Sequence, residues 1–204
     1  MNQQVMRRLP NIFTFLRLIL IPVFVLLMLD PSILMLRAAL VVFMLAAFTD
    51  YLDGRIARKY GAVTDFGKLL DPIADKILVM AALIMIMGLG PDESGENLLP
   101  AWLVVMILAR ETWVNGLRSM AAAKGVVVAA SKIGKLKSAI QMLAIVLMLM
   151  QDWPIEIGEW SIPCPYIGIR LLVVSVVISY WGAIEYSILL LGKETGLLNK
   201  TDNQ

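Results

Sequence analysis

The sequence predicts an all-α membrane protein, and three observations lead to this fold class. The chain of 204 residues is 59% hydrophobic and only 17% charged, with a mean hydropathy of +0.79, an apolar content above that of soluble domains. Apolar runs near the length of a bilayer span, about 20 residues, recur along it. Basic residues gather in alternate connections between these runs. We therefore expect one integral-membrane domain over residues 1–204, a polytopic protein with six transmembrane helices and a short N-terminal interfacial segment.

The expected elements follow one another along the chain. Residues 1–9 carry Arg7 and Arg8 and are expected to lie at the membrane surface. The first apolar run contains Arg17 and has no small-residue cleavage site after Leu29, so we expect it to be retained as a span. Each run is long enough to cross the bilayer as a helix, in which the backbone groups satisfy one another. The six runs cover residues 10–29, 34–53, 69–90, 98–120, 133–151 and 166–191.

The charges between the runs predict the orientation of the chain. Lysine and arginine lie before the first run, between the second and third, between the fourth and fifth, and after the last, whereas the other connections are acidic. An excess of lysine and arginine marks the cytoplasmic side. We therefore expect both termini, and the connection between the second and third spans, on the cytoplasmic side.

The absence of histidine limits the chemistry that the chain can perform. Without histidine there is no Ser-His-Asp triad, no HExxH zinc site and no imidazole base. The single cysteine, Cys164, cannot form an internal disulfide. The remaining candidates are carboxylates, lysine, arginine, hydroxyls and hard metal ions.

Four aspartates lie at the ends of the second and third spans. Asp50 and Asp53 are three residues apart and Asp71 and Asp75 are four apart, so each pair shares a helix face. A polar connection is expected over residues 54–67, and antiparallel helices on either side of it would bring the pairs together. Four such carboxylates repel one another unless divalent cations lie between them, and an all-oxygen site suits Mg²⁺ or Mn²⁺. Solvated charges at a helix end remain the alternative, chiefly for the first pair, because the second pair lies within apolar sequence.

The whole stretch reads D-x2-D-G-x2-A-R-x8-G-x3-D-x3-D, and it resembles the signature of the CDP-alcohol phosphotransferase family at every fixed position. These positions are Asp50, Asp53, Gly54, Ala57, Arg58, Gly67, Asp71 and Asp75. A match is a hypothesis that needs its structural context, and here the motif bridges two expected spans. The resemblance implies transfer of a phosphatidyl or similar group from a CDP-linked donor to an alcohol, with release of CMP.

The resemblance also implies a role for each residue of the motif. The four aspartates would hold two divalent cations, Mg²⁺ or Mn²⁺, and Asp75 would in addition act as the general base for the attacking hydroxyl. Small residues let the nucleotide approach the backbone closely. The expected contacts of the donor's nucleotide and pyrophosphate are Gly54, Ala57, Arg58, Thr64 and Gly67.

Basic residues in and after the fourth span indicate an acceptor that carries a phosphate. Guanidinium and ammonium groups bind phosphate oxygens, and the start of a helix adds a positive dipole. Glu111 is available to pair with an arginine. A positive loop at lipid headgroups is the alternative for Lys124, Lys132 and Lys137, and a helix anchor is the alternative for Arg170. The predicted phosphate-binding residues are Arg110, Arg118, Ser131 and Lys135, with Lys132 and Arg170 as further candidates.

This basic region and the stretch Leu9–Phe24 resemble bacterial members of the family that use CDP-diacylglycerol as donor and sn-glycerol 3-phosphate as acceptor, giving phosphatidylglycerophosphate. Asn11, Thr14 and Arg17 fall at helical spacing and are candidate contacts of the nucleotide, with a polar edge at the membrane surface as the alternative. The implied partners are both substrates, membrane lipids and a second copy in a homodimer. The implied location is the bacterial cytoplasmic (inner) membrane.

Two other functions are weighed against this one. A sister enzyme would use serine, inositol phosphate or phosphatidylglycerol as acceptor, and a phosphate-free acceptor would leave Arg110, Arg118 and Lys135 without a charged ligand. A divalent-cation transporter would carry its acidic residues near the bilayer midplane, on broken helices in repeated halves. In this sequence the carboxylates cluster at one cytoplasmic edge, and no second half repeats them.

Overall fold

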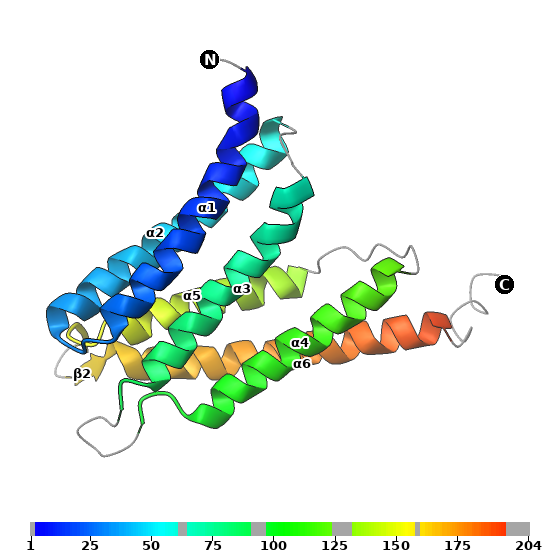
Figure 1. Ribbon diagram of the computed structural model, residues 1–204. Coiled ribbons are helices and arrows are strands. Elements are labelled where there is room, and N and C mark those ends of the chain that lie inside the picture. The colour runs from blue at the N-terminus through cyan, green and yellow to red at the C-terminus, as the bar shows by residue number, and fades with distance from the viewer. Residues whose placement is uncertain (1–2, 61–64, 91–96, 124–131, 158–159, 195–204) are drawn as a thin grey trace.

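The computed structural model of the chain describes residues 3–60, 65–90, 97–123, 132–157 and 160–194. For residues 3–14, 50–60, 65–72, 75, 132, 133, 135, 155–157, 160 and 190–194, only the backbone is described. The helices are α1 (Gln3–Met28), α2 (Ile33–Tyr60), α3 (Asp65–Met87), α4 (Ala101–Ala123), α5 (Lys132–Leu149) and α6 (Cys164–Glu194), and the strands are β1 (Pro154–Ile157) and β2 (Trp160–Pro163) (Figure 1). Each apolar run of the sequence lies in one helix, so the predicted helical fold is confirmed.

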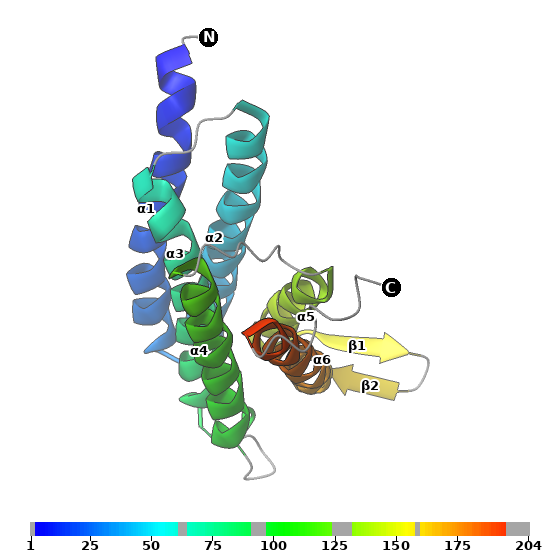
Figure 2. The same ribbon diagram turned by 90° about the vertical axis from the view of Figure 1, so that its right-hand side faces the viewer.

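The helices converge at one end of the molecule and diverge from it, with α1, α2 and α3 running toward the top of Figure 1 and α4, α5 and α6 toward its right. The connection between α1 and α2, the start of α4 and the β1–β2 hairpin lie at the lower left of Figure 1, whereas the first turns of α1 and the end of α2 lie at the top. The antiparallel pairs α1–α2 and α5–α6 pack most extensively, α3 packs against α1, and α4 packs against α6. Figure 2 shows the group α1–α3 from the side, with α5 and α6 seen nearly end-on.

Several helices begin earlier or end later than the sequence indicates. The expected connection over residues 54–67 is mostly helical, because α2 continues to Tyr60 and α3 begins at Asp65. Gly54 is a poor helix former, but the alanine, arginines and lysine that follow it favour the helix. The predicted interfacial segment is also not a separate element, since α1 runs without a break from Gln3 into the first apolar run.

The structure adds a small antiparallel hairpin to the all-α prediction. In β1 and β2, Pro154 pairs with Pro163 and Ile157 pairs with Trp160. The segment contains β-branched and aromatic residues, which favour strands. Strands of four residues are too short for the periodicity by which a strand is recognised in a sequence.

Close contacts between small and aromatic residues hold the helix pairs together. The rings of Phe24 in α1 and Phe43 in α2 have their centroids 5.9 Å apart. Gly168 in α6 lies so close to α5 that an added Cβ would be 2.7 Å from the carbonyl oxygen of Ala144 and 2.7 Å from Cγ of Met148. Small residues allow helix backbones to approach in this way within membranes.

The surface of the helices is apolar, as expected for contact with lipid. Large apolar side chains are exposed on every helix, for example Leu26, Leu34, Ile84 and Val177. An aqueous surface rarely carries so much contiguous apolar area. Within the described residues, one stretch, Cys164–Leu189, is long and apolar enough to cross a membrane by length and composition, and shorter apolar stretches lie in α1, α2, α3 and α5.

Candidate active site

The two aspartate pairs are carried by consecutive helices and lie at matched positions along them. Asp50 lies ten residues before the end of α2, and Asp75 lies ten residues after the start of α3. Asp53 lies about 10 Å along the helix axis from the end of α2, at the usual rise per residue. Asp71 lies about 10 Å along the axis from the start of α3. Figure 1 shows the end of α2 and the start of α3 at the same end of the molecule. The backbone therefore places both pairs in the halves of α2 and α3 that are nearest this end, and the convergence of their carboxylates stays a prediction.

The donor set at this end suits hard divalent cations. The side chains of Asp50, Asp53, Asp71 and Asp75 lie outside the described part, so the ligand set stays a prediction. Among the side chains that the structure does describe, no group of three or more His, Cys, Asp or Glu residues is placed to hold a metal ion. Four carboxylates and no nitrogen or sulfur donors are the ligands expected for Mg²⁺ or Mn²⁺.

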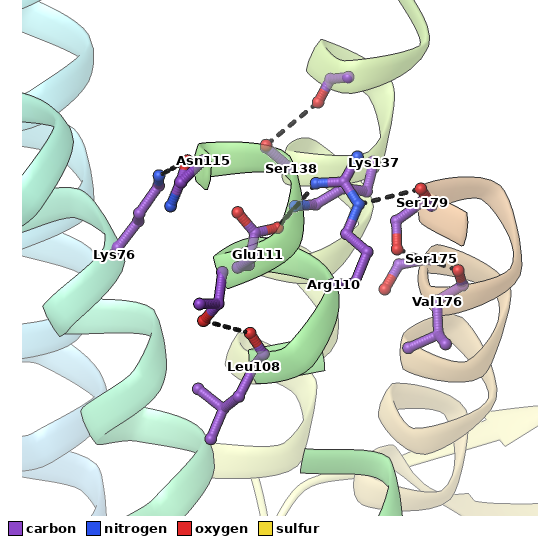
Figure 3. A network of polar contacts seen from close by, with 12 residues as sticks. Lys76, Leu108, Arg110, Glu111, Asn115, Lys137, Ser138, Ser175, Val176 and Ser179 are labelled. Carbon is purple, nitrogen blue, oxygen red and sulfur yellow. Dashed lines mark hydrogen bonds and ion pairs between the residues drawn. The ribbon is translucent and has the colours of Figure 1, made fainter. Parts of the chain in front are cut away.

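A polar cluster lies where α4, α5 and α6 meet, and Figure 3 shows it from close by. Arg110 donates from Nη1 to Oε1 of Glu111 at 3.0 Å and from Nε to the backbone oxygen of Ser179 at 2.9 Å. Nζ of Lys137 forms an ion pair with the same oxygen of Glu111. The expected pairing of Glu111 with an arginine is thus confirmed, and a lysine from α5 shares its carboxylate.

A second contact joins this region to the helix that carries Asp71 and Asp75. Lys76 in α3 donates to Oδ1 of Asn115 in α4 (Figure 3). Asn115 lies one helical turn beyond Glu111, on the same side of α4, and Lys76 directly follows Asp75 in the chain. Arg110 and Arg118, the predicted phosphate ligands on α4, therefore lie within about one turn of Asn115, which contacts α3.

Arg118 and Arg170, the other predicted phosphate ligands with described side chains, lie apart from this cluster. Arg118 is exposed and lies two turns beyond Arg110 on α4. Arg170 is exposed on α6, nine residues before Ser179 and thus about 14 Å from it along the helix axis, a placement that agrees with a helix anchor. Lys132 and Lys135 lie in the first turn of α5, with side chains outside the described part, and Ser131 lies outside the described residues.

The structure places the predicted donor contacts in the same helices as the aspartates. Gly54, Ala57 and Arg58 lie in α2 and Gly67 lies in α3, whereas Thr64 is outside the described residues. Asn11 and Thr14 lie in α1, with side chains outside the described part. Arg17, one turn further along α1, is fully buried, which is inconsistent with the alternative of a polar edge at the membrane surface for this residue.

A family model described as CDP-alcohol phosphatidyltransferase matches residues 7–184, which include every residue of the motif and of the polar cluster. The chain belongs to the CDP-alcohol phosphatidyltransferase family. The match extends from the first turns of α1 far into α6, so the family domain includes all the helices described here.

Several bacterial relatives of this CDP-alcohol phosphatidyltransferase chain share the name CDP-diacylglycerol–glycerol-3-phosphate 3-phosphatidyltransferase. The Bacillus subtilis protein is 39% identical over 188 residues, covering 86% of this chain and 93% of its own length. The Shigella flexneri serotype 5b protein is 36% identical over 179 residues, covering 87% and 91%. The Rickettsia typhi protein is 43% identical over 145 residues, covering 71% and 78%.

Glu111, Asn115 and Lys137 are polar residues of this family chain that the sequence analysis does not assign to the site. A signal was available for two of them. Glu111 and Lys137 interrupt apolar runs, and a charge within a span is costly unless it has a partner or a function. The same cost singles out Arg110 in the sequence, and it applies equally to Glu111 and Lys137.

Proposed function

We propose that the chain transfers the phosphatidyl group of CDP-diacylglycerol to sn-glycerol 3-phosphate, giving phosphatidylglycerophosphate and CMP. The observation that carries the proposal is the full D-x2-D-G-x2-A-R-x8-G-x3-D-x3-D motif on two consecutive helices. The relatives named for this reaction, of which the chain covers up to 93%, support the choice of donor and acceptor.

The residues of the motif suit each part of this reaction. A hydroxyl of the acceptor attacks the phosphorus that carries diacylglycerol, and the bond between this phosphorus and the bridging oxygen breaks, so that CMP leaves with that oxygen. Asp75 takes the proton of the hydroxyl as general base. Asp50, Asp53, Asp71 and Asp75 would hold two divalent cations, Mg²⁺ or Mn²⁺, which when bound neutralise charge on the pyrophosphate. Positioning and neutralisation supply most of the rate in phosphoryl transfer.

The binding residues lie on either side of these carboxylates. The donor would bind to small residues and one cation on α2 and α3, namely Gly54, Ala57, Arg58 and Gly67. Thr64, which lies between these helices in the sequence, would complete the set. Arg110 on α4 would receive the acceptor's phosphate, because its Nη2 makes no hydrogen bond within the described part of the chain. Lys135 and Ser131, near the start of α5, would approach the same phosphate.

The proposed setting is the bacterial cytoplasmic membrane. Six spanning helices with both termini on the cytoplasmic side would leave the diacyl tails of the donor in lipid and open the site to a water-soluble acceptor. The exposed apolar side chains on all the helices support this placement. The homodimer expected from the family resemblance stays a prediction.

The test is CMP release by purified protein in detergent with Mg²⁺ or Mn²⁺ and CDP-diacylglycerol. Glycerol 3-phosphate, serine, inositol phosphate and phosphatidylglycerol are offered separately, with Asp75→Asn as the comparison. We expect release with glycerol 3-phosphate alone, and a loss of about 100-fold or more in Asp75→Asn, the range for a general base. Release with a different acceptor would overturn the acceptor assignment and keep the carboxylate chemistry. No release with any acceptor, from folded protein, would overturn the proposed function.

A further inference from the structure

Three charged side chains are buried together inside the helix bundle. The side chains of Arg110, Glu111 and Lys137 are 11%, 15% and 9% exposed. Two cations and one anion leave one net positive charge. Burying such charges costs several kcal/mol for each ion unless partners and hydrogen bonds compensate. Charged residues kept inside a bundle at this cost indicate a functional site, and a guanidinium beside an ammonium group suits phosphate oxygens.

Glu111 determines where the two cations lie. Its Oε1 accepts from Nη1 of Arg110 at 3.0 Å and also from Nζ of Lys137. The backbone oxygen of Ser179 holds Nε of Arg110 from the opposite side. Without the carboxylate between them, the two cations would repel each other at short range. The shared oxygen therefore keeps a guanidinium from α4 and an ammonium from α5 side by side.

The cluster also has a defined relation to the helix that carries Asp75. Asn115, four residues after Glu111, accepts a hydrogen bond from Lys76, the residue after Asp75. The face of α4 that carries Glu111 and Asn115 is thus the face that contacts α3. Gln141, one turn beyond Lys137 on α5, is buried, and its Nε2 has no acceptor among the described residues, so a further donor is available on this side of α5.

We propose that Glu111 is a positioning residue of the acceptor site, which holds Arg110 and Lys137 side by side so that both bind the acceptor's phosphate. This inference rests on the proposed function. It assigns Lys137 to phosphate binding rather than to lipid headgroups, and its burial supports that assignment. Glu111 acts through the two cations and does not touch the substrate.

A competing role for Glu111 predicts the opposite result. If its carboxylate only occupied the phosphate site until the acceptor displaced it, removing its charge would tighten acceptor binding. The burial of the cations argues against this, because two buried cations side by side are costly without an anion between them. Among the described residues, Nη2 of Arg110 makes no hydrogen bond while Nη1 is bound to Glu111, so it can donate to a phosphate.

The experiment compares Glu111→Gln with wild-type protein in the CMP-release assay. We expect the KM for glycerol 3-phosphate to rise about 10-fold to 100-fold, the worth of a hydrogen bond to a charged group. The kcat at saturating acceptor and the KM for CDP-diacylglycerol stay within about threefold of the wild-type values, as expected when only binding of the acceptor is weakened. Inhibition by inorganic phosphate weakens by the same factor as the acceptor. Glu185→Gln, which alters an exposed carboxylate on α6, is the matched control and leaves all these values unchanged.

Two further variants keep the inference testable if Glu111→Gln does not fold. Lys137→Gln removes one of the two cations and is expected to raise the same KM, whereas Glu111→Asp keeps the charge and restores part of the affinity. An acceptor KM that is unchanged or lowered in Glu111→Gln, or in Lys137→Gln, would overturn the inference. Wild-type protein that releases no CMP with glycerol 3-phosphate contradicts the proposed function instead. In that case the binding of inorganic phosphate is measured by calorimetry. Weaker binding in these variants than in the wild-type protein supports the inference, and unchanged binding overturns it.

Discussion

Asp71 lies in the second turn of α3, four residues before Asp75 and thus on the same helix face. In the proposed reaction it holds metal without acting as the base, so its substitution separates the two roles. Asp30, in the exposed connection between α1 and α2, accepts a hydrogen bond from the backbone N–H of Ser32 at 3.0 Å. It lies at the opposite end of the molecule and provides a matched carboxylate.

We predict that Asp71→Asn lowers activity at a fixed Mg²⁺ concentration by at least about 100-fold. The loss of a group that only orients a metal ligand already lowers metal affinity or activity by up to about 100-fold, and Asp71 is a proposed ligand itself. Its activity should recover in part as Mg²⁺ is raised, because the lost group binds metal. Activity titrated against Mg²⁺ measures this effect. Asp30→Asn should follow the wild-type curve, and a variant Asp71→Asn that does so too would remove Asp71 from the metal site.

The sequence predicts single charged residues of the site better than it predicts their partners. Arg110 is recognised because a cation within an apolar run has to be explained. The contacts around it cannot be predicted in this way. Lys137 is 26 residues from Glu111 and approaches it only when α4 and α5 come together. The backbone oxygen of Ser179 leaves no signal in the sequence at all, since every residue carries one.

At the level of the helices, α6 packs closely against α5 at Gly168. A side chain there would meet the carbonyl oxygen of Ala144 and the side chain of Met148, both in α5. The backbone oxygen cannot move aside unless the helix moves. Gly116 in α4 is the matched case, because an added Cβ there meets nothing within 4 Å.

We predict that Gly168→Val lowers the Tm of the protein in detergent by about 2–10 °C. Overpacking costs about 1–3 kcal/mol, and each kcal/mol shifts the Tm of a chain of this size by about 2–4 °C. Gly116→Ala should not lower the Tm, because alanine favours a helix more than glycine does. Thermal unfolding followed by circular dichroism measures both. An unchanged Tm in Gly168→Val would mean that α5 and α6 are not packed as described.

The elements themselves are largely predictable, and their ends are less so. Six apolar runs of span length identify the helices, since no other sequence feature is so long or so regular. The end of α2 at Tyr60 is missed because Gly54 and several charges resemble a loop, although most of these residues favour a helix. The β1–β2 hairpin is missed because strands of four residues leave too short a pattern.

At the scale of the whole molecule, the two ends differ in the residues that they carry. The end with the β1–β2 hairpin holds Arg37, which bonds Asp152 from Nε at 2.8 Å and lies over the ring of Trp153 at 5.3 Å. The other end holds the aspartates. The connections at the hairpin end are acidic in the sequence, whereas those at the other end are rich in lysine and arginine. An excess of lysine and arginine marks the cytoplasmic side, so the hairpin end is the proposed outer side.

We predict that single cysteines report this orientation. In a Cys164→Ala background, a membrane-impermeant maleimide should label Asp30→Cys and Gln151→Cys in intact spheroplasts, and Ala122→Cys and Ala123→Cys only after lysis. All four positions are exposed and lie outside the expected spans or at their ends, so a lack of label in intact cells reports the membrane barrier. Labelling of Ala122→Cys or Ala123→Cys before lysis would contradict the proposed topology.

The proposed reaction is a metal-dependent transfer of the phosphatidyl group to glycerol 3-phosphate, and it moves the acceptor into the lipid fraction. Purified protein in detergent receives CDP-diacylglycerol, radiolabelled sn-glycerol 3-phosphate and Mg²⁺, and the label in the lipid extract is measured over time. We predict that label enters lipid in proportion to the CMP released, that EDTA stops it, that added Mg²⁺ or Mn²⁺ restores it, and that Asp75→Asn lacks it. Folded protein that releases CMP without moving label into lipid, or that transfers label equally well in EDTA, would contradict the account.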